Sequence, residues 1–226
     1  MKHAKLEGIF LFFVLVLILI GNVHAETVTP TTLAILPFEN NSITEPDKYA
    51  PLSKGLAAML ITDLKKTGTS LILIERGKIQ AIIKEIALGQ TGSVDKSTAM
   101  KAGKILGAQS IAFGSFMVLG KNVRIDTRIV KVETSELIMS EGIDGSADNF
   151  ITLERELAQK IADSLKVALK PSTGKSKSDI NAAIYFSQGL DALDRGDTAE
   201  AKRLFDKCIK LDSAYKDQVA EAGGQG

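Results

Sequence analysis

The sequence predicts a mixed α/β fold in which a mixed β-sheet is flanked by helices and followed by a C-terminal helical hairpin. Two short apolar runs, each followed by a stretch of helical periodicity, predict alternating strands and helices over residues 33–89. Two longer strand patterns joined by Gly120-Lys121-Asn122 predict a β-hairpin. Two more helical patterns after residue 179 predict the helical hairpin.

The first 25 residues have the composition of a cleavable secretory signal. Two lysines precede an apolar run at residues 9–20, and a small-residue pattern ends at Ala25. The run has about a dozen residues, whereas an uncleaved anchor helix needs roughly 20. We therefore expect cleavage after Ala25 and export to the periplasm. Glu26 follows Ala25, so the cysteine that a lipid anchor needs at this point is absent.

The first half of the remaining chain alternates between buried strands and helices. Leu33–Phe38 and Ser70–Glu75 are short apolar runs that predict strands. Residues 52–64 predict an amphipathic helix, and residues 79–86 predict a helix that ends by Gly89. This order favours at least one pair of parallel strands.

The second half predicts a hairpin, one more strand and a long helix. A short helix at residues 97–106 should end at Gly107, before the paired strands Gln109–Leu119 and Val123–Val132. Alternation of apolar and charged residues on the second of these strands predicts one buried face. The remaining predicted elements are a strand at Leu137–Ile143 and a helix capped by Asp148 that continues to Leu169.

These elements give five predicted segments. They are a signal at 1–25, an α/β domain at 33–169, a polar linker at 171–179, a helical hairpin at 180–215 and a flexible tail at 216–226.

Composition argues against several classes of function. Cleavage would remove two of the 28 basic and one of the 27 acidic side chains, which leaves a formally neutral chain without the basic patch typical of nucleic-acid binding. Both histidines, His3 and His24, would leave with the signal. Gly174-Lys175-Ser176 lacks the preceding glycine and strand of a phosphate-binding loop. No acidic pair has an apolar setting that predicts a shifted pKa, so we expect no catalytic residue, no metal, no cofactor and no enzymatic activity.

The tail has a specific spacing of small and bulky residues. The positions are Tyr185, Gly189, Ala192, Gly196, Asp197, Ala201, Phe205, Cys208, Leu211 and Asp212. This spacing resembles a single tetratricopeptide repeat, whose helices need small residues where they cross. One repeat cannot bury its own faces, so it needs a partner surface in cis or in trans. We expect partner binding through Tyr185, Gly189, Phe205 and Leu211, and a packing role for Cys208.

Five segments follow one another in a recognisable order. They are LAILPFEN, GLAAMLITDLKKTG, LILIERGKIQAIIKE, LGAQSIAFGSF and RIDTRIVKVETSELI. Together they resemble the CsgG family, which is named for the curli-secretion channel. The resemblance spans roughly Leu33 to Leu169 and implies a mixed sheet, an envelope location and ring-forming or scaffolding behaviour without catalysis. Within it, Glu75 and Arg76 are either a strand-end ion pair that caps the next helix or a second partner contact.

We therefore expect a non-enzymatic periplasmic scaffold or adaptor in outer-membrane assembly or secretion. Its partners would be envelope proteins or further copies of itself, with no nucleic acid and no lipid-anchor cysteine. Two alternatives stay open. One is an oligomeric outer-membrane secretion channel of the curli type, and the other is an accessory regulator of a peptidoglycan synthase.

Overall fold

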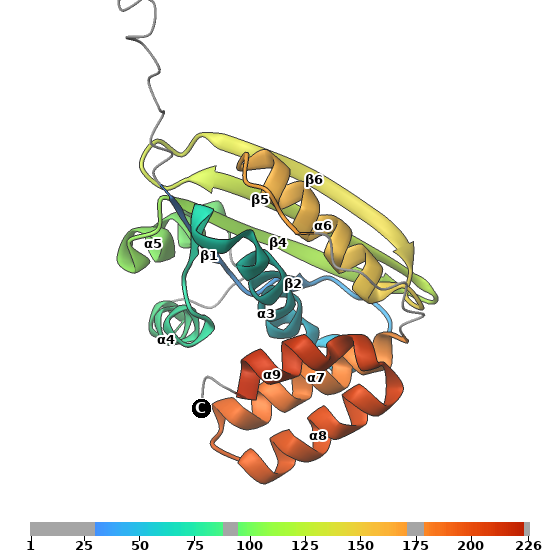
Figure 1. Ribbon diagram of the computed structural model, residues 1–226. Helices are drawn as coiled ribbons and strands as arrows, with labels where there is room; N and C mark the ends of the chain where they lie inside the picture. Colours follow the sequence, from blue (N-terminus) through green and yellow to red (C-terminus); the bar gives the residue numbers. More distant parts are fainter. Residues whose placement is uncertain (1–29, 88–94, 171–178, 224–226) are drawn as a thin grey trace, which may run out of the picture.

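The computed structural model describes residues 30–87, 95–170 and 179–223 (Figure 1). The predicted signal with its cleavage site at Ala25, nearly all of the predicted linker and the last three residues lie outside these ranges.

A mixed sheet forms the centre of the fold, as predicted. Its order is β3-β1-β4-β5-β6, and β2 also pairs with β4. The first strands are parallel, with β1 between β3 and β4, whereas β4, β5 and β6 are antiparallel. The strands are β1 (Thr31–Ile35), β2 (Glu39–Asn40), β3 (Leu71–Leu73), β4 (Ser110–Leu119), β5 (Asn122–Lys131) and β6 (Leu137–Ser146).

Helices cover both faces of this sheet (Figure 1). On one face lie α3 (Leu52–Leu64) and α6 (Phe150–Ser164), while α4 (Arg76–Ala87) and α5 (Lys96–Leu106) lie on the other. The short helix α2 (Pro46–Tyr49) precedes α3. The ends of α5 follow from local chemistry: the Asp95 side chain accepts a hydrogen bond from the Thr98 amide at 2.7 Å, and Gly107 ends the helix at φ 65°.

Several predicted boundaries are wrong by a few residues. The second predicted strand is confined to Leu71–Leu73, and β6 continues to Ser146. The long helix is capped at Asn149 rather than Asp148 and ends at Ser164 rather than Leu169. Lys166 adopts φ 57°, and the Val167 amide donates to the Ala162 carbonyl at 3.0 Å. This left-handed C-terminal motif ends the helix early.

The C-terminal residues form a helical unit of three helices. It comprises α7 (Ile180–Asp194), α8 (Thr198–Leu211), the short 3₁₀ turn η2 (Ser213–Tyr215) and α9 (Lys216–Gly223). Gly196, at φ 79°, makes the tight turn between α7 and α8. The sequence predicts a flexible tail from Lys216 onward, but the structure has the helix α9 there. Helix α9 packs against α3, and its residues Gln218 and Ala222 are buried.

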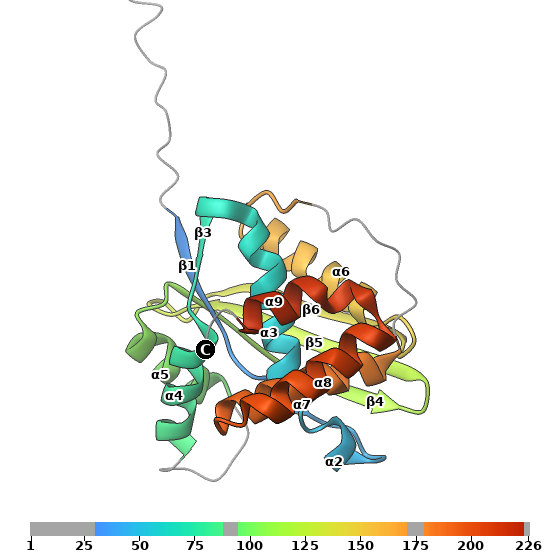
Figure 2. The ribbon, with the colours of Figure 1, turned by 60° about the horizontal axis from the view of Figure 1, so that its bottom comes forward.

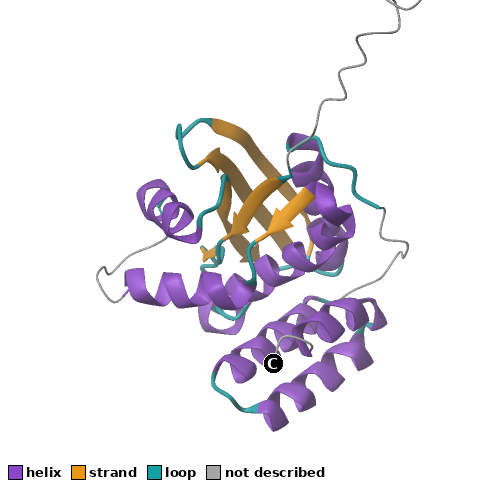
Figure 3. Ribbon diagram, turned by 60° about the vertical axis from the view of Figure 1, so that its left-hand side comes forward, coloured by secondary structure: helices purple, strands orange, loops and turns teal. Residues whose placement is uncertain are grey.

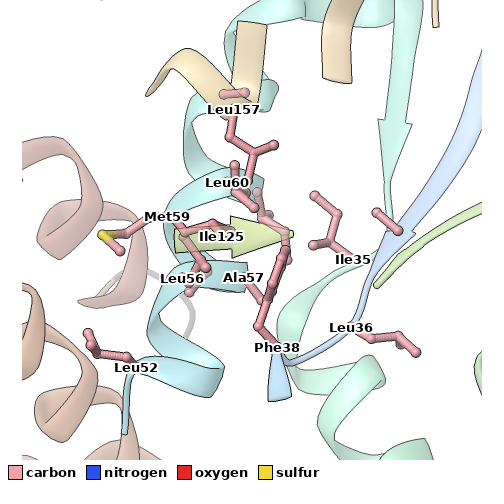
Figure 4. Close-up of a cluster of buried hydrophobic side chains, with 14 of the residues drawn as sticks. Ile35, Leu36, Phe38, Leu52, Leu56, Ala57, Met59, Leu60, Ile125 and Leu157 are labelled. Carbon is pink, nitrogen blue, oxygen red and sulfur yellow. The ribbon is translucent and has the colours of Figure 1, made fainter. Parts of the chain in front are cut away.

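Helix α3 is buried on both sides, which corrects the prediction of an amphipathic helix. Eleven of its 13 residues are buried. The sheet and α6 cover one side, and the helical unit covers the other (Figures 2 and 3). Figure 4 shows Leu52 and Met59 extending from α3 away from Ile35 and Phe38. A helix with apolar residues on two opposite sides suits such a central position.

Candidate partner-binding surfaces

The tightest contact between the helical unit and the α/β region is the crossing of α3 and α7. A Cβ atom placed on Gly55 would lie 1.7 Å from Ser187 Oγ and 2.7 Å from Ser187 Cβ. Ser187 is fully buried and donates to the Ala183 carbonyl at 2.6 Å, so its hydroxyl is satisfied within α7. Glycine at position 55 therefore allows the two helices to approach this closely. The open choice between packing in cis and in trans is thus resolved in this structure in favour of packing in cis.

Ion pairs join the two parts at one end of α3. Lys54 Nζ lies 2.7 Å from Asp191 Oδ1 and 3.4 Å from Asp194 Oδ2. Arg76 Nη1 lies 2.7 Å from Asp194 Oδ1. Burial lowers the pKa of Lys54, but its hydrogen bond to Asp191 and the nearby carboxylates outweigh burial and raise that pKa overall.

Further ion pairs join the two parts at the other end of α3. Lys66 Nζ lies 3.7 Å from Asp217 Oδ2, and Lys65 pairs with Glu221. In every ion pair that we describe across this contact, the cation belongs to the α/β region and the carboxylate to the helical unit. The contact is therefore electrostatically polarised as well as apolar.

The four predicted partner-binding residues of the hairpin do not share one surface. A Cβ on Gly189 would lie 2.4 Å from Phe205 Cε1, and Phe205 is buried, so these two residues pack α7 against α8. Tyr185 is half-buried, with Lys207 Nζ 5.4 Å from its ring centre. Leu211 is half exposed. Tyr185 and Leu211 are thus the two that a partner can reach.

Glu75 and Arg76 also separate in the structure. Arg76 turns to Asp194 of the helical unit, as described above, whereas Glu75 is exposed just before α4. The sequence does not reveal this connection, because Arg76 and Asp194 lie far apart along the chain.

A buried acidic pair was missed, and the expectation that none exists is wrong. Asp63 of α3 and Glu154 of α6 are both buried. Burial raises the pKa of Glu154 well above its usual value, and the charge of Asp63 and a hydrogen bond to it add to the effect. Lys66 Nζ lies 2.6 Å from Asp63 Oδ1, and Arg155 Nε lies 3.8 Å from Asp63 Oδ2.

A signal for Glu154 exists in the sequence. Phe150, Glu154, Leu157 and Ile161 recur at helical spacing, so Glu154 lies on the stripe that α6 buries. Because both carboxyl groups are closed to solvent, the site favours the protonated form of Glu154, and the arrangement suits a structural pair.

Cys208 lies in the interior of the helical unit, where it is fully buried. Burial, with a contribution from the charge of Asp212, raises the pKa of Cys208 to about 12. Few thiolates form at neutral pH under these conditions. The environment of Cys208 is therefore that of a side chain that packs in the interior.

A cavity of about 1050 Å³ lies where β1 begins and where α5 and α6 end. Its lining includes Lys104, Lys131 and Lys166, and Lys131 pairs with Glu136 at 2.6 Å. The C-terminal ends of two helices meet here, and lysines complement the negative ends of helix dipoles. The lysines thus have a structural explanation.

No group of three or more acidic, cysteine or histidine side chains suited to a metal ion occurs within residues 30–87, 95–170 and 179–223. In the same part of the chain, no helix is long and apolar enough to cross a membrane.

The family model described as curli production assembly/transport component CsgG matches residues 29–126. This part of the chain is similar to that family. The match runs from the start of β1 into β5, so the CsgG-like region contains α3 and its cations, whereas the helical unit lies outside it. No curated protein matches the chain.

Solved structures also resemble the chain. TolB from Acinetobacter baumannii is 13% identical with a TM-score of 0.40, over 61% of this chain and 28% of TolB. Lipoprotein GNA1162 from Neisseria meningitidis is 17% identical with a TM-score of 0.44, over 60% of this chain and 99% of that one. The LpoB C-terminal domain from Salmonella enterica is 16% identical with a TM-score of 0.36, over 55% and 89%.

Proposed function

We propose that the protein is a non-enzymatic component of the bacterial cell envelope, a periplasmic CsgG-like scaffold or adaptor for outer-membrane assembly or secretion. The observation that carries this proposal is the CsgG match over residues 29–126. The predicted signal supports export, and the neutral composition of the mature chain supports action through protein contacts.

We further infer that residues 180–215 are one repeat of the tetratricopeptide type. The antiparallel arrangement of α7 and α8, with Gly189 against Phe205 at their crossing, supports this inference. A lone repeat needs a surface to cover it, and α3 provides one. Its exposed edge, with Tyr185 and Leu211, is then available to an envelope partner.

Cell fractionation and native sizing test the adaptor function. We expect the chain cleaved after Ala25 in the periplasmic fraction, in complexes larger than its monomer, after in vivo cross-linking. Leu211→Glu should deplete these complexes, whereas Ile105→Glu, at an equally exposed leucine-sized position on α5, should leave them intact.

Two results would contradict the proposal. If the wild type and Leu211→Glu both run as free monomers after cross-linking, the proposed adaptor function is wrong. Recovery of the protein in the cytoplasm would remove the envelope location. Extraction only by detergent would instead favour the channel alternative.

A further inference from the structure

The side of the helical unit that faces α3 has a defined chemistry. We call it the inner face and define it by Ser187, Asp191 and Asp194 of α7 with Asp217 and Glu221 of α9. On α7 the spacing is i, i+4 and i+7, and on α9 it is i and i+4, so each set lies along one side of its helix. The inner face therefore combines a small apolar crossing point with carboxylates near both ends of α3.

The opposing surface of α3 has the complementary chemistry. Lys54 and Lys66 lie near its two ends, and both remain partly accessible, with side-chain exposures of 35% and 26%. Met59 lies between them along the helix, and Leu52, at the start of α3, extends to the same side (Figure 4). The ion pairs at the two ends of the contact stay partly exposed, as the polar rims of contacts between domains do.

We propose that the inner face is a recognition surface for an apolar helix with lysines near its two ends, and that α3 occupies it in cis. A helix of the same chemistry from a partner replaces α3 when the helical unit detaches. This inference rests on the proposed adaptor function, because it adds a second partner surface to the exposed edge with Tyr185 and Leu211. It names the kind of helix that this second surface would bind. Tethered elements meet at effective concentrations of about millimolar, so docking in cis is the default state.

The reporter for detachment is a thiol at the centre of the contact. Ser187→Cys, combined with Cys208→Ser in the full chain, places one thiol where α3 covers it. Labelling of this thiol by a maleimide should be slow in the docked protein. Lys54→Glu in this background should accelerate labelling at least tenfold, because it sets a third carboxylate beside Asp191 and Asp194.

Exchanging the two charges of an ion pair distinguishes loss of that specific contact from general destabilisation of the protein. Lys54→Glu combined with Asp191→Lys restores an opposite pair and should return labelling to within about threefold of the reporter protein. Lys65→Glu and its partner exchange Glu221→Lys repeat the test at the other end of α3. Lys104→Glu, a matched charge reversal on α5, should change nothing. Circular dichroism shows whether each variant is folded, and any unfolded variant is excluded from the comparison.

Trans recognition is tested with a synthetic peptide of residues 51–66, added to the reporter protein that carries Lys54→Glu. The peptide should slow labelling again, whereas the same peptide with its three lysines replaced by glutamate should not.

Equal labelling rates with and without both charge reversals would overturn the inference, since the helical unit would then be a fixed part of the core. Failure of both charge exchanges to restore slow labelling, or a peptide effect independent of its lysines, would overturn it as well. None of these measurements requires an envelope partner, so their failure is distinct from failure of the adaptor function.

Discussion

At the scale of single residues, Glu154 has the most unusual environment described above. It is fully buried, faces Asp63 across the junction of α3 and α6, and has a raised pKa because of burial and that second carboxyl group. Below the ordinary glutamate pKa of about 4.3, both the folded and unfolded chains hold the proton. As pH rises, the unfolded chain releases its proton first, so the free energy of unfolding falls until the pH passes the raised folded pKa.

Replacing this residue should remove that part of the pH dependence. We expect Glu154→Gln to flatten the fall in the free energy of unfolding that begins above the ordinary glutamate pKa, because the amide cannot ionise. Each unit by which the folded and unfolded pKa values differ corresponds to about 1.4 kcal/mol. Urea denaturation at several pH values measures the effect.

The matched control is Glu156→Gln, on the exposed side of the same helix. It should leave the wild-type pH profile unchanged. A Glu154→Gln profile parallel to that of the wild type would show that Glu154 is ionised in the folded protein.

At the scale of elements, α9 is the helix that the sequence predicts least well. Its apolar residues Val219, Ala220 and Ala222 are too few to distinguish a packed helix from a polar tail. Only the structure shows that Val219 and Ala222 contribute to the core, while Asp217 and Glu221 reach the lysines that follow α3. The helix forms because tertiary contacts support a short segment whose own propensity is marginal.

Truncation distinguishes a packed helix from a tail. Ending the chain after Tyr215 should lower the free energy of unfolding by about 2 kcal/mol, from the loss of apolar burial and two partly exposed ion pairs. Ending it after Gly223 should have no effect. Thermal unfolding followed by circular dichroism compares the two, and equal stabilities would mean that α9 contributes nothing to the fold.

Sequence patterns predict a helix or strand well when only one of its faces is buried. The alternation on β5 matches the burial of Val123, Ile125 and Ile129, and Gly107 ends α5 as predicted. Patterns are less informative about α3, because burial on two sides weakens the amphipathic signal by which a surface helix is oriented. The contacts of Arg76 with Asp194 and of Asp63 with Glu154 are not predictable from local spacing, since each joins elements far apart along the chain.

At the scale of the whole molecule, the helical unit has an interior of its own. Phe186 lies 5.9 Å from Phe205 and 6.0 Å from Tyr215 between ring centres, and Cys208 is buried in the same unit. These side chains belong to the core that also includes α3, so we expect global unfolding to expose them.

Cys208 therefore reports global unfolding in the wild-type chain. With a pKa of about 12 and no exposure, its thiol should resist iodoacetamide at pH 8 and react only through the globally unfolded population. Labelling rates measured at increasing urea should follow the unfolding free energy. Rapid labelling without urea would show that the interior of the unit opens on its own.

The double coverage of α3 has a consequence for biosynthesis. The helix emerges from the ribosome early, but the elements that cover its outer side are the last to be made. Until then, the chain presents an uncovered apolar surface, which invites aggregation. A truncated or stalled product would keep that surface exposed, so correct synthesis depends on keeping the chain unfolded or protected until its final helices are complete.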